Sequence, residues 1–296
     1  MSSNLYKNRP SLAGIDISKY SIEELKALVR EILEQKIHGI CFSPYIEGQG
    51  PGTPITAEQI RERLAVIQPY VEWVRIFSCS EGNELIPKIA KEYGLKTLVG
   101  VWLDDDKASN ELELKNAIDV AKSGNADHLA VGNEVLLRDE MSEFELIDYI
   151  NRAKKGAPGV AVGYVDAYFK FVDYPRVSDA CDVLFANCYP FWEECPAEHA
   201  LVYMKEMYRQ AVNAAKGKKV VISETGWPNL GATEGGAVPS FENAIRYFIN
   251  AYQWAEEEGV EIFYFSSFDE TWKVAQEGDV GAYWGIWDKD GQLKYV

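Results

Sequence analysis

Residues 220–228 have the sequence VVISETGWP, a short run of β-branched residues that ends in a carboxylate, a glycine, a tryptophan and a proline. Valine and isoleucine favour a strand that is buried on both faces, and Gly226 and Pro228 end it. We therefore predict that Glu224 lies at the end of a buried strand, where side chains leave the sheet. Residues 128–135, HLAVGNEV, follow the same pattern and predict that Glu134 ends a second buried strand.

Strands and helices are predicted to alternate along the chain, which indicates right-handed β-α-β units and a parallel sheet, either doubly wound or closed into a barrel. From residue 39 onward the predicted strands are 39–45, 73–79, 95–103, 128–135, 159–165, 183–189, 220–224 and 260–268. Eight strands are the number found in a (β/α)8, or TIM, barrel, so we predict this fold. Glu134 then ends strand four and Glu224 ends strand seven, on the same rim.

Five helices are predicted at 22–35, 83–93, 142–156, 197–216 and 240–258. Two more are predicted from their caps: one opened by Thr56 and Gln59, and one that Asn110 and Glu113 cap and Gly124 ends. No amphipathic helix follows the last strand, so the helix at 22–35 is expected to cover it. A further short strand is predicted at 12–17. We assign residues 1–37 to an N-terminal extension and residues 38–296 to the barrel, with the whole chain as one domain.

The composition limits the possible partners. A chain of 296 residues suits one barrel, and a net charge of −16 argues against nucleic acid or an anionic membrane as partner. A neutral ligand remains open, and we expect a monomer. The five cysteines form no C-x-x-C pair and their odd number favours a reducing compartment. Because the N-terminus has no apolar signal-peptide core, we expect a cytoplasmic location, or a periplasmic or secreted one if a leader has been removed.

Two carboxylates facing one cleft suit glycoside hydrolysis, in which one group donates a proton while the other attacks or activates water. The three histidines are not at metal-ligand spacing, so no metal is expected. The chain also has no P-loop and no G-x-S-x-G nucleophile elbow, and we expect no cofactor. Aromatic residues near the predicted strand ends are candidates for stacking on sugar rings: Tyr45, Trp102, Tyr189, Phe191, Trp192, Trp227, Phe268 and Trp272.

Four segments together resemble glycoside hydrolase family 17, the β-1,3-glucanase family. They are AVGNE at 130–134, NCYPF at 187–191, ISETGWP at 222–228 and FDETWK at 268–273. The segments occur in the family's order and the resemblance extends from about residue 38 to the C-terminus. It implies a retaining (β/α)8 barrel that acts on β-1,3-glucan.

The resemblance also implies roles for individual residues. Glu134 would be the general acid/base, Glu224 the nucleophile and Asn133 the residue that holds the sugar 2-hydroxyl. Supporting roles near the two glutamates would fall to Tyr189, Arg75, Glu270 and Lys273, and Asp269 is a further candidate substrate contact. The chain departs from the family pattern near its end, where Glu277 matches a family glutamate only with a shift, so Glu277 is left out of the predicted site.

Several alternatives remain open at this point. The N-terminal part resembles the bacterial and fungal branch of the family, and a loop at 46–55 that closes one end of the groove would imply action from chain ends. Water or a second sugar could release the product, giving hydrolysis or transfer. Outside this class, the chain could be a carbohydrate-binding barrel without activity. A barrel enzyme for a phosphorylated metabolite has only Gly231, Gly235 and Gly236 as a weak phosphate cradle.

Overall fold

A closed barrel of eight parallel strands forms the centre of the molecule, and each strand pairs with the next along the chain until β8 closes on β1. The computed structural model describes residues 14–16 and 19–295. The strands are β1 (Ile37–Cys41), β2 (Val71–Ile76), β3 (Lys96–Val101), β4 (His128–Asn133), β5 (Ala161–Ala167), β6 (Val183–Asn187), β7 (Lys219–Thr225) and β8 (Ile262–Tyr264). The predicted (β/α)8 fold is confirmed.

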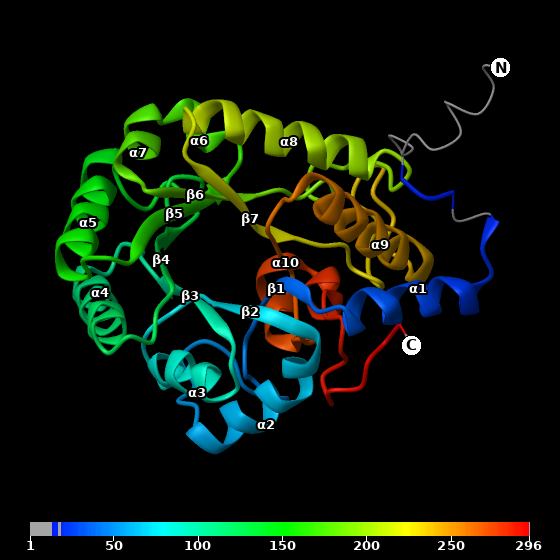
Figure 1. Cartoon of the computed structure of the whole chain (residues 1–296), viewed down its shortest axis with the longest axis horizontal. Helices are drawn as coiled ribbons and strands as arrows, with labels where there is room; N and C mark the ends of the chain where they lie inside the picture. The colour runs from blue at the N-terminus through cyan, green and yellow to red at the C-terminus, as the bar shows by residue number, and fades with distance from the viewer. Residues whose placement is uncertain (1–13, 17–18, 296) are drawn as a thin grey trace.

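Helices surround the barrel as an outer ring (Figure 1). The larger ones are α1 (Ile22–Glu34), α2 (Ala57–Ile67), α3 (Ile86–Glu92), α4 (Lys107–Lys122), α5 (Glu143–Gly156), α8 (Ala200–Ala215) and α9 (Phe241–Glu258). Short helical segments are α6 (Lys170–Asp173), α7 (Pro175–Ala180) and α10 (Val274–Glu277), with 3-10 turns η2 (Gln68–Tyr70), η3 (Asn83–Leu85), η4 (Thr271–Lys273) and η5 (Asp279–Tyr283). The pair α6 and α7 was not predicted, because helices of four to six residues are too short to show a helical period.

Helix α1 lies beside α9 in the outer ring (Figure 1). It occupies the place of the helix that would follow β8, where this chain has only short helical segments. Its buried face consists of Leu25, Val29 and Leu33. This is the covering position predicted for the first helix. Of the strand predicted at 12–17, only residues 14–16 lie within the described part of the chain, and they form no strand.

Two of the three predicted helix caps are confirmed. Ser142 forms a full capping box with Glu145, and Thr56 accepts a hydrogen bond from the Gln59 backbone. The cap at Asn110 was wrong, because α4 begins one turn earlier, where the Asp106 carboxylate accepts from two backbone N–H groups. The Asn110 side chain instead holds the preceding loop through two hydrogen bonds with the Asp104 backbone, of 3.0 and 2.8 Å.

Aromatic and imidazole rings fill the amino-terminal end of the barrel. Trp73 stacks with His38 at a centroid distance of 5.6 Å and with His128 at 5.2 Å, and Phe263 contacts both His38 and Trp73 edge-on. Two of the three histidines are therefore part of this packed floor. The described residues contain no cluster of His, Cys, Asp and Glu able to hold a metal ion. Nor is any helix in the described ranges long and apolar enough to cross a membrane.

Candidate active site

The two predicted glutamates lie on the carboxyl-end rim of the barrel, where β4 and β7 end. Glu224 is the penultimate residue of β7, whereas Glu134 follows the last residue of β4. Glu134 adopts a left-handed backbone conformation with φ of 54°, two residues after Gly132, which has φ of 83°. Its N–H still donates to Val165 O on β5 at 2.8 Å. This turn takes the Glu134 side chain out of the pleat of the strand.

Asn187, at the end of β6, connects the two carboxylates. Its side-chain nitrogen donates to Glu134 Oε1 at 2.8 Å and to Glu224 Oε1 at 3.0 Å. The two oxygens cannot be farther apart than the sum of those distances, which is below the ~6.5 Å at which inverting pairs begin. The Asn187 oxygen accepts from the Ser223 hydroxyl at 2.8 Å, which fixes the orientation of the amide.

Glu224 is held by a cation and a phenol. Arg75 on β2 forms an ion pair with Glu224 Oε1 at 2.8 Å, and the Tyr189 hydroxyl donates to Oε2 at 2.8 Å. Burial, followed by the Glu224 charge, raises the pKa of Tyr189 well above its usual value, so the phenol keeps its proton. Arg75 also donates to Asn133 Oδ1 at 2.6 Å. The structure thus brings the predicted residues Arg75, Tyr189 and Asn133 together around this glutamate.

Glu134 has the opposite electrostatic environment. Burial is the largest effect that raises the pKa of Glu134 to about 7, and the nearby Glu224 charge adds to it. The Asn187 hydrogen bond and the Arg138 charge act in the other direction but do not cancel the shift. Glu134 therefore keeps its proton to a higher pH than an ordinary carboxyl group, as the proton donor in acid-assisted bond cleavage must.

A cavity of about 310 Å³ lies over these groups. Its walls are carboxylates, an amide and several aromatic rings: Glu134, Leu137, Ala167, Tyr168, Phe169, Asn187, Tyr189, Trp192, Glu193, Glu224, Phe265 and Glu277. Polar groups at the base and ring faces along the wall suit a sugar, which has hydroxyls around its edge and C–H groups on its faces.

Glu277 was left out of the predicted site but lines this cavity. It lies at the end of α10, and burial raises its pKa to about 7 although Lys273 acts to lower it. Its Oε2 atom has no hydrogen-bond partner among the described residues. Its only signal in the sequence was the shifted spacing to Trp284 and Gly285, because a one-turn helix can move a side chain without preserving its spacing.

Glu270 and Lys273 form a buried ion pair of 2.6 Å, and the ammonium lies 4.1 Å from the centre of the Phe265 ring. The Trp272 indole donates to Glu270 Oε1 at 2.9 Å. The Asp269 carboxylate instead binds Lys294 at 2.7 Å and accepts from the Gly285 N–H at 2.9 Å. Asp269 therefore holds the C-terminal tail against the rim, and it also lines the pocket that Tyr45 and Trp272 border.

The predicted sugar-stacking aromatics separate into two groups. Trp192 is 40% exposed and lines the cavity. Trp227 and Phe191 are fully buried, pack on each other, and the Trp227 N–H donates to Val238 O at 3.1 Å. The prediction of substrate stacking was wrong for both, because apolar packing beneath the rim covers their faces. Trp102 lies outside the described cavity, with the Arg138 guanidinium 4.7 Å from its ring centre.

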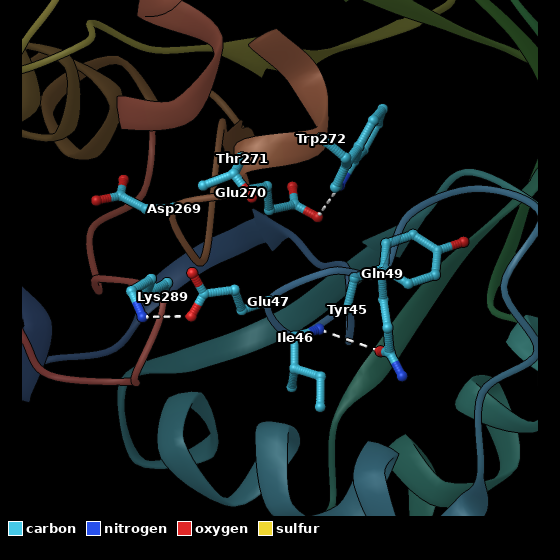
Figure 2. Close-up of a pocket in the computed structure, with 9 residues that line it drawn as sticks. All are labelled: Tyr45, Ile46, Glu47, Gln49, Asp269, Glu270, Thr271, Trp272 and Lys289. Atoms are coloured by element: carbon cyan, nitrogen blue, oxygen red, sulfur yellow. Dashed lines mark hydrogen bonds and ion pairs between the residues drawn. The ribbon is translucent and has the colours of Figure 1, made fainter. Parts of the chain in front are cut away.

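Tyr45 and Trp272 border a second, smaller pocket between the β1–α2 loop and the segments after β8 (Figure 2). Their rings pack edge to face at 6.2 Å. Across this pocket Glu47 forms an ion pair of 2.8 Å with Lys289 of the C-terminal tail (Figure 2). The Gly52 N–H of the same loop donates to Glu81 Oε2 at 2.7 Å. The predicted loop at 46–55 is thus fastened to two other parts of the rim.

A closed (β/α)8 barrel with two adjacent glutamates on its carboxyl rim, beneath an aromatic-lined cavity, defines a barrel-type glycoside hydrolase. Residues 39–285 match the family model described as the BtgE/BtgC glycoside hydrolase domain. The solved structure of the glycoside hydrolase family 17 β-1,3-glucanosyltransferase from Rhizomucor miehei matches with a TM-score of 0.78 at 30% identity, covering 88% of this chain and 96% of that chain. The chain belongs to the BtgE/BtgC glycoside hydrolases and to glycoside hydrolase family 17.

Other relatives are similar over most of their length. The glucan 1,3-β-glucosidase of Candida albicans is 29% identical over 259 residues, which cover 78% of this chain and 83% of that protein. The glucan 1,3-β-glucosidase of Saccharomyces cerevisiae is 27% identical over 269 residues, which cover 82% and 86%. An active-site mutant of the Rhizomucor miehei enzyme in complex with laminaritriose matches with a TM-score of 0.79 at 29% identity, covering 88% of this chain and 96% of that chain.

Proposed function

We propose that this glycoside hydrolase cleaves β-1,3-linked glucan of the laminarin type by double displacement, with retention at the anomeric carbon. The observation that carries the proposal is the single Asn187 nitrogen that binds both Glu134 and Glu224, because it keeps the two bridged oxygens closer together than the separation at which inverting pairs begin. The names of the relatives support the substrate, and their fungal origin supports placing the chain in the bacterial and fungal branch of the family.

In the first step Glu224 attacks the anomeric carbon while Glu134 gives its proton to the departing oxygen. The resulting ester removes the negative charge of Glu224. Since that charge helps to raise the pKa of Glu134, its loss makes Glu134 more acidic and leaves a carboxylate that accepts a proton from water. Arg75 holds the Asn133 oxygen, which leaves the Asn133 amide nitrogen to donate to the sugar 2-hydroxyl.

The orientation of the glucan follows from the position of the acid. Because Glu134 follows β4 and Glu224 lies near the end of β7, we place the departing sugar toward β4 to β6 and the retained sugar toward β8 and β1. The loop at 46–55 is fastened by the ion pair of Glu47 with Lys289 and faces the segments after β8 (Figure 2). A loop that closes the retained side in this way favours cleavage from chain ends.

Transfer to a second sugar is the alternative outcome of the same chemistry. The side of the cavity for the departing sugar carries the exposed ring of Trp192 together with Tyr168 and Phe169. This aromatic surface can hold an acceptor sugar against the glycosyl-enzyme after the first product leaves. A sugar hydroxyl then takes the place of water, and Glu134 accepts its proton.

Timed product analysis of a β-1,3-linked glucose hexamer tests this proposal. Proton NMR should show the β-anomer of the newly formed reducing end first, and mass spectrometry should show loss of one short unit at a time from one end. Products longer than the hexamer would establish transfer. A cello-hexaose control should remain uncleaved. An α-anomer as first product would overturn the retaining mechanism, and equal cleavage of both hexamers would overturn the proposed linkage.

The pH dependence provides a second prediction. The general acid must be protonated, so kcat/KM should fall about tenfold per pH unit above a midpoint near the pKa of Glu134, about 7. Glu277 has a pKa raised to about the same value and needs a control. The variant Glu277→Gln should keep this alkaline limb. Its disappearance in that variant would show that Glu277, and not Glu134, controls the limb.

A further inference from the structure

The backbone turn that carries Glu134 needs support from its neighbours. A φ of 54° is a conformation that residues with side chains seldom adopt. One support comes from Arg138, whose N–H donates to Glu134 O at 2.9 Å and whose guanidinium binds Asn133 O and, at 3.0 Å, Leu103 O. A second support comes from β5, on the opposite side of the turn.

Tyr164 of β5 holds this turn in two ways. Its ring packs over Gly132, where an added Cβ would lie 3.1 Å from the ring carbon Cε2. Its hydroxyl accepts a hydrogen bond of 3.0 Å from the N–H of Leu136, two residues after Glu134. Tyr164 is 1% exposed, so this N–H has no water to replace the contact. The residues on both sides of Glu134 are thus fastened to one phenol.

Asp166 fixes the orientation of that phenol. It lies two residues further along β5, on the same face of the strand, and is fully buried. The Tyr164 hydroxyl donates its single proton to Asp166 Oδ2, and Oδ1 accepts from the Ala167 N–H at 2.7 Å. Because the proton points at Asp166, a lone pair of the phenol oxygen points at Leu136. Because the Asp166 carboxylate takes the phenol proton, the Tyr164 oxygen is free to accept the hydrogen bond that the Leu136 N–H of the turn donates.

We propose that the Tyr164–Asp166 pair is a positioning device for the general acid/base, which holds the 132–136 turn so that the Glu134 carboxyl faces the departing oxygen. This inference rests on the proposed role of Glu134. Neither residue lines the described cavity, so neither acts by touching the substrate.

The pair also contributes a charge. The groups that face Glu134 are Glu224 from β7 and Asp166 from β5, which raise its pKa, and Asn187 and Arg138, which lower it. Burial raises the pKa of Asp166 to about 6, and Lys170 and Arg138 act against that shift. Asp166 is therefore an anion where the alkaline limb of activity is measured. Its negative charge keeps the proton on Glu134 to a higher pH.

The dependence of kcat/KM on the leaving group shows whether Tyr164 positions the general acid or only stabilises the site as a whole. A laminari-oligosaccharide needs protonation of its departing oxygen, whereas a 2,4-dinitrophenyl β-laminaribioside does not. For Tyr164→Phe, kcat/KM on the oligosaccharide should fall by up to about 100-fold, the loss that a small misplacement of a reacting group can cause. The same constant for the dinitrophenyl substrate should fall less than about threefold, since no acid is needed there.

Two further variants distinguish a failure of the proposed function from a failure of the positioning role of Tyr164. Glu134→Ala is the reference and should show a larger loss on the oligosaccharide with the dinitrophenyl substrate spared. If it shows no such difference, the proposed function fails and the inference fails with it. Tyr252→Phe is the matched control, because this buried tyrosine donates to Gly39 O at 3.2 Å in another part of the barrel. It should affect both substrates equally and only slightly.

Asp166→Asn tests the charge and keeps the test possible if Tyr164→Phe does not fold. Removing the negative charge lowers the pKa of Glu134, so the alkaline limb should move to lower pH, by roughly half a unit. An unchanged limb would overturn the contribution of the charge. Equal losses on both substrates in Tyr164→Phe, with Glu134→Ala behaving as expected, would overturn the positioning role and leave Tyr164 as a packing residue.

Discussion

Glu224→Gln should lower kcat on a β-1,3-linked glucose hexamer by roughly 10⁴-fold or more, because an amide cannot attack the anomeric carbon and the covalent route is lost. The protein should still fold but with lower stability, because the Arg75 guanidinium stays buried without its carboxylate partner. Binding of the hexamer, measured by calorimetry, should persist. Glu258→Gln, on the exposed end of α9, is the matched control and should keep full activity.

Azide assigns the two roles by the stereochemistry of the product. In Glu224→Gly, azide can enter the space of the missing nucleophile and should give an α-glycosyl azide by one displacement. In Glu134→Ala, azide attacks the glycosyl-enzyme and should give the β-glycosyl azide by two displacements. The reverse assignment of products would exchange the roles of the two glutamates. Residual activity above about a tenth in Glu224→Gln would exclude it as the nucleophile.

Arg75→Met should destabilise the fold by about 3–5 kcal/mol, because it leaves the Glu224 carboxylate buried without its cation. Both side chains are almost fully buried, at 2% and 8% exposure, so water cannot replace the contact. The free energy of unfolding, from urea titration, measures the loss. Activity should fall as well, because Arg75 also fixes Asn133 at 2.6 Å.

The double variant Arg75→Met/Glu224→Gln separates charge burial from lost packing. Once the carboxylate is neutral, removal of the cation should cost much less, and the coupling between the two sites should amount to about 1–3 kcal/mol. Arg61→Met is the matched control, since Arg61 pairs with Glu92 on the surface and should cost less than about 1 kcal/mol. Equal costs for Arg75→Met with and without Glu224 would show that Arg75 contributes by packing alone.

The local sequence pattern was sufficient to predict the fold and the positions of Glu134 and Glu224 at strand ends. The β-branched run before Glu224 and the apolar run before Glu134 each predict a strand end, and the count of eight strands predicts that both ends share a rim. Asn187 had the same signal, since it ends the apolar run VLFAN of β6, but nothing in the sequence shows which carboxylates an amide will bridge. Its role appears only with its distances to Glu134 and Glu224.

Burial was the property that local pattern could not supply. Trp227 and Trp192 both follow strands, yet Trp227 is fully buried and Trp192 is 40% exposed, although both rings pack against Phe191. Glu277 entered the cavity through a one-turn helix that has no readable period. The support of Tyr164 and Asp166 for the Glu134 turn likewise depends on contacts between two strands.

The sequence by itself determined the order of strands and helices, the barrel and the placement of Glu134 and Glu224 at strand ends, because hydrophobic period and chain-breaking residues act over a few neighbours. Only the tertiary structure decided which aromatic faces meet the cavity, which carboxyl keeps a proton and how the acid is held. Those properties depend on desolvation and on charges from β2, β5, β6 and β7, which lie close together only once the barrel has closed.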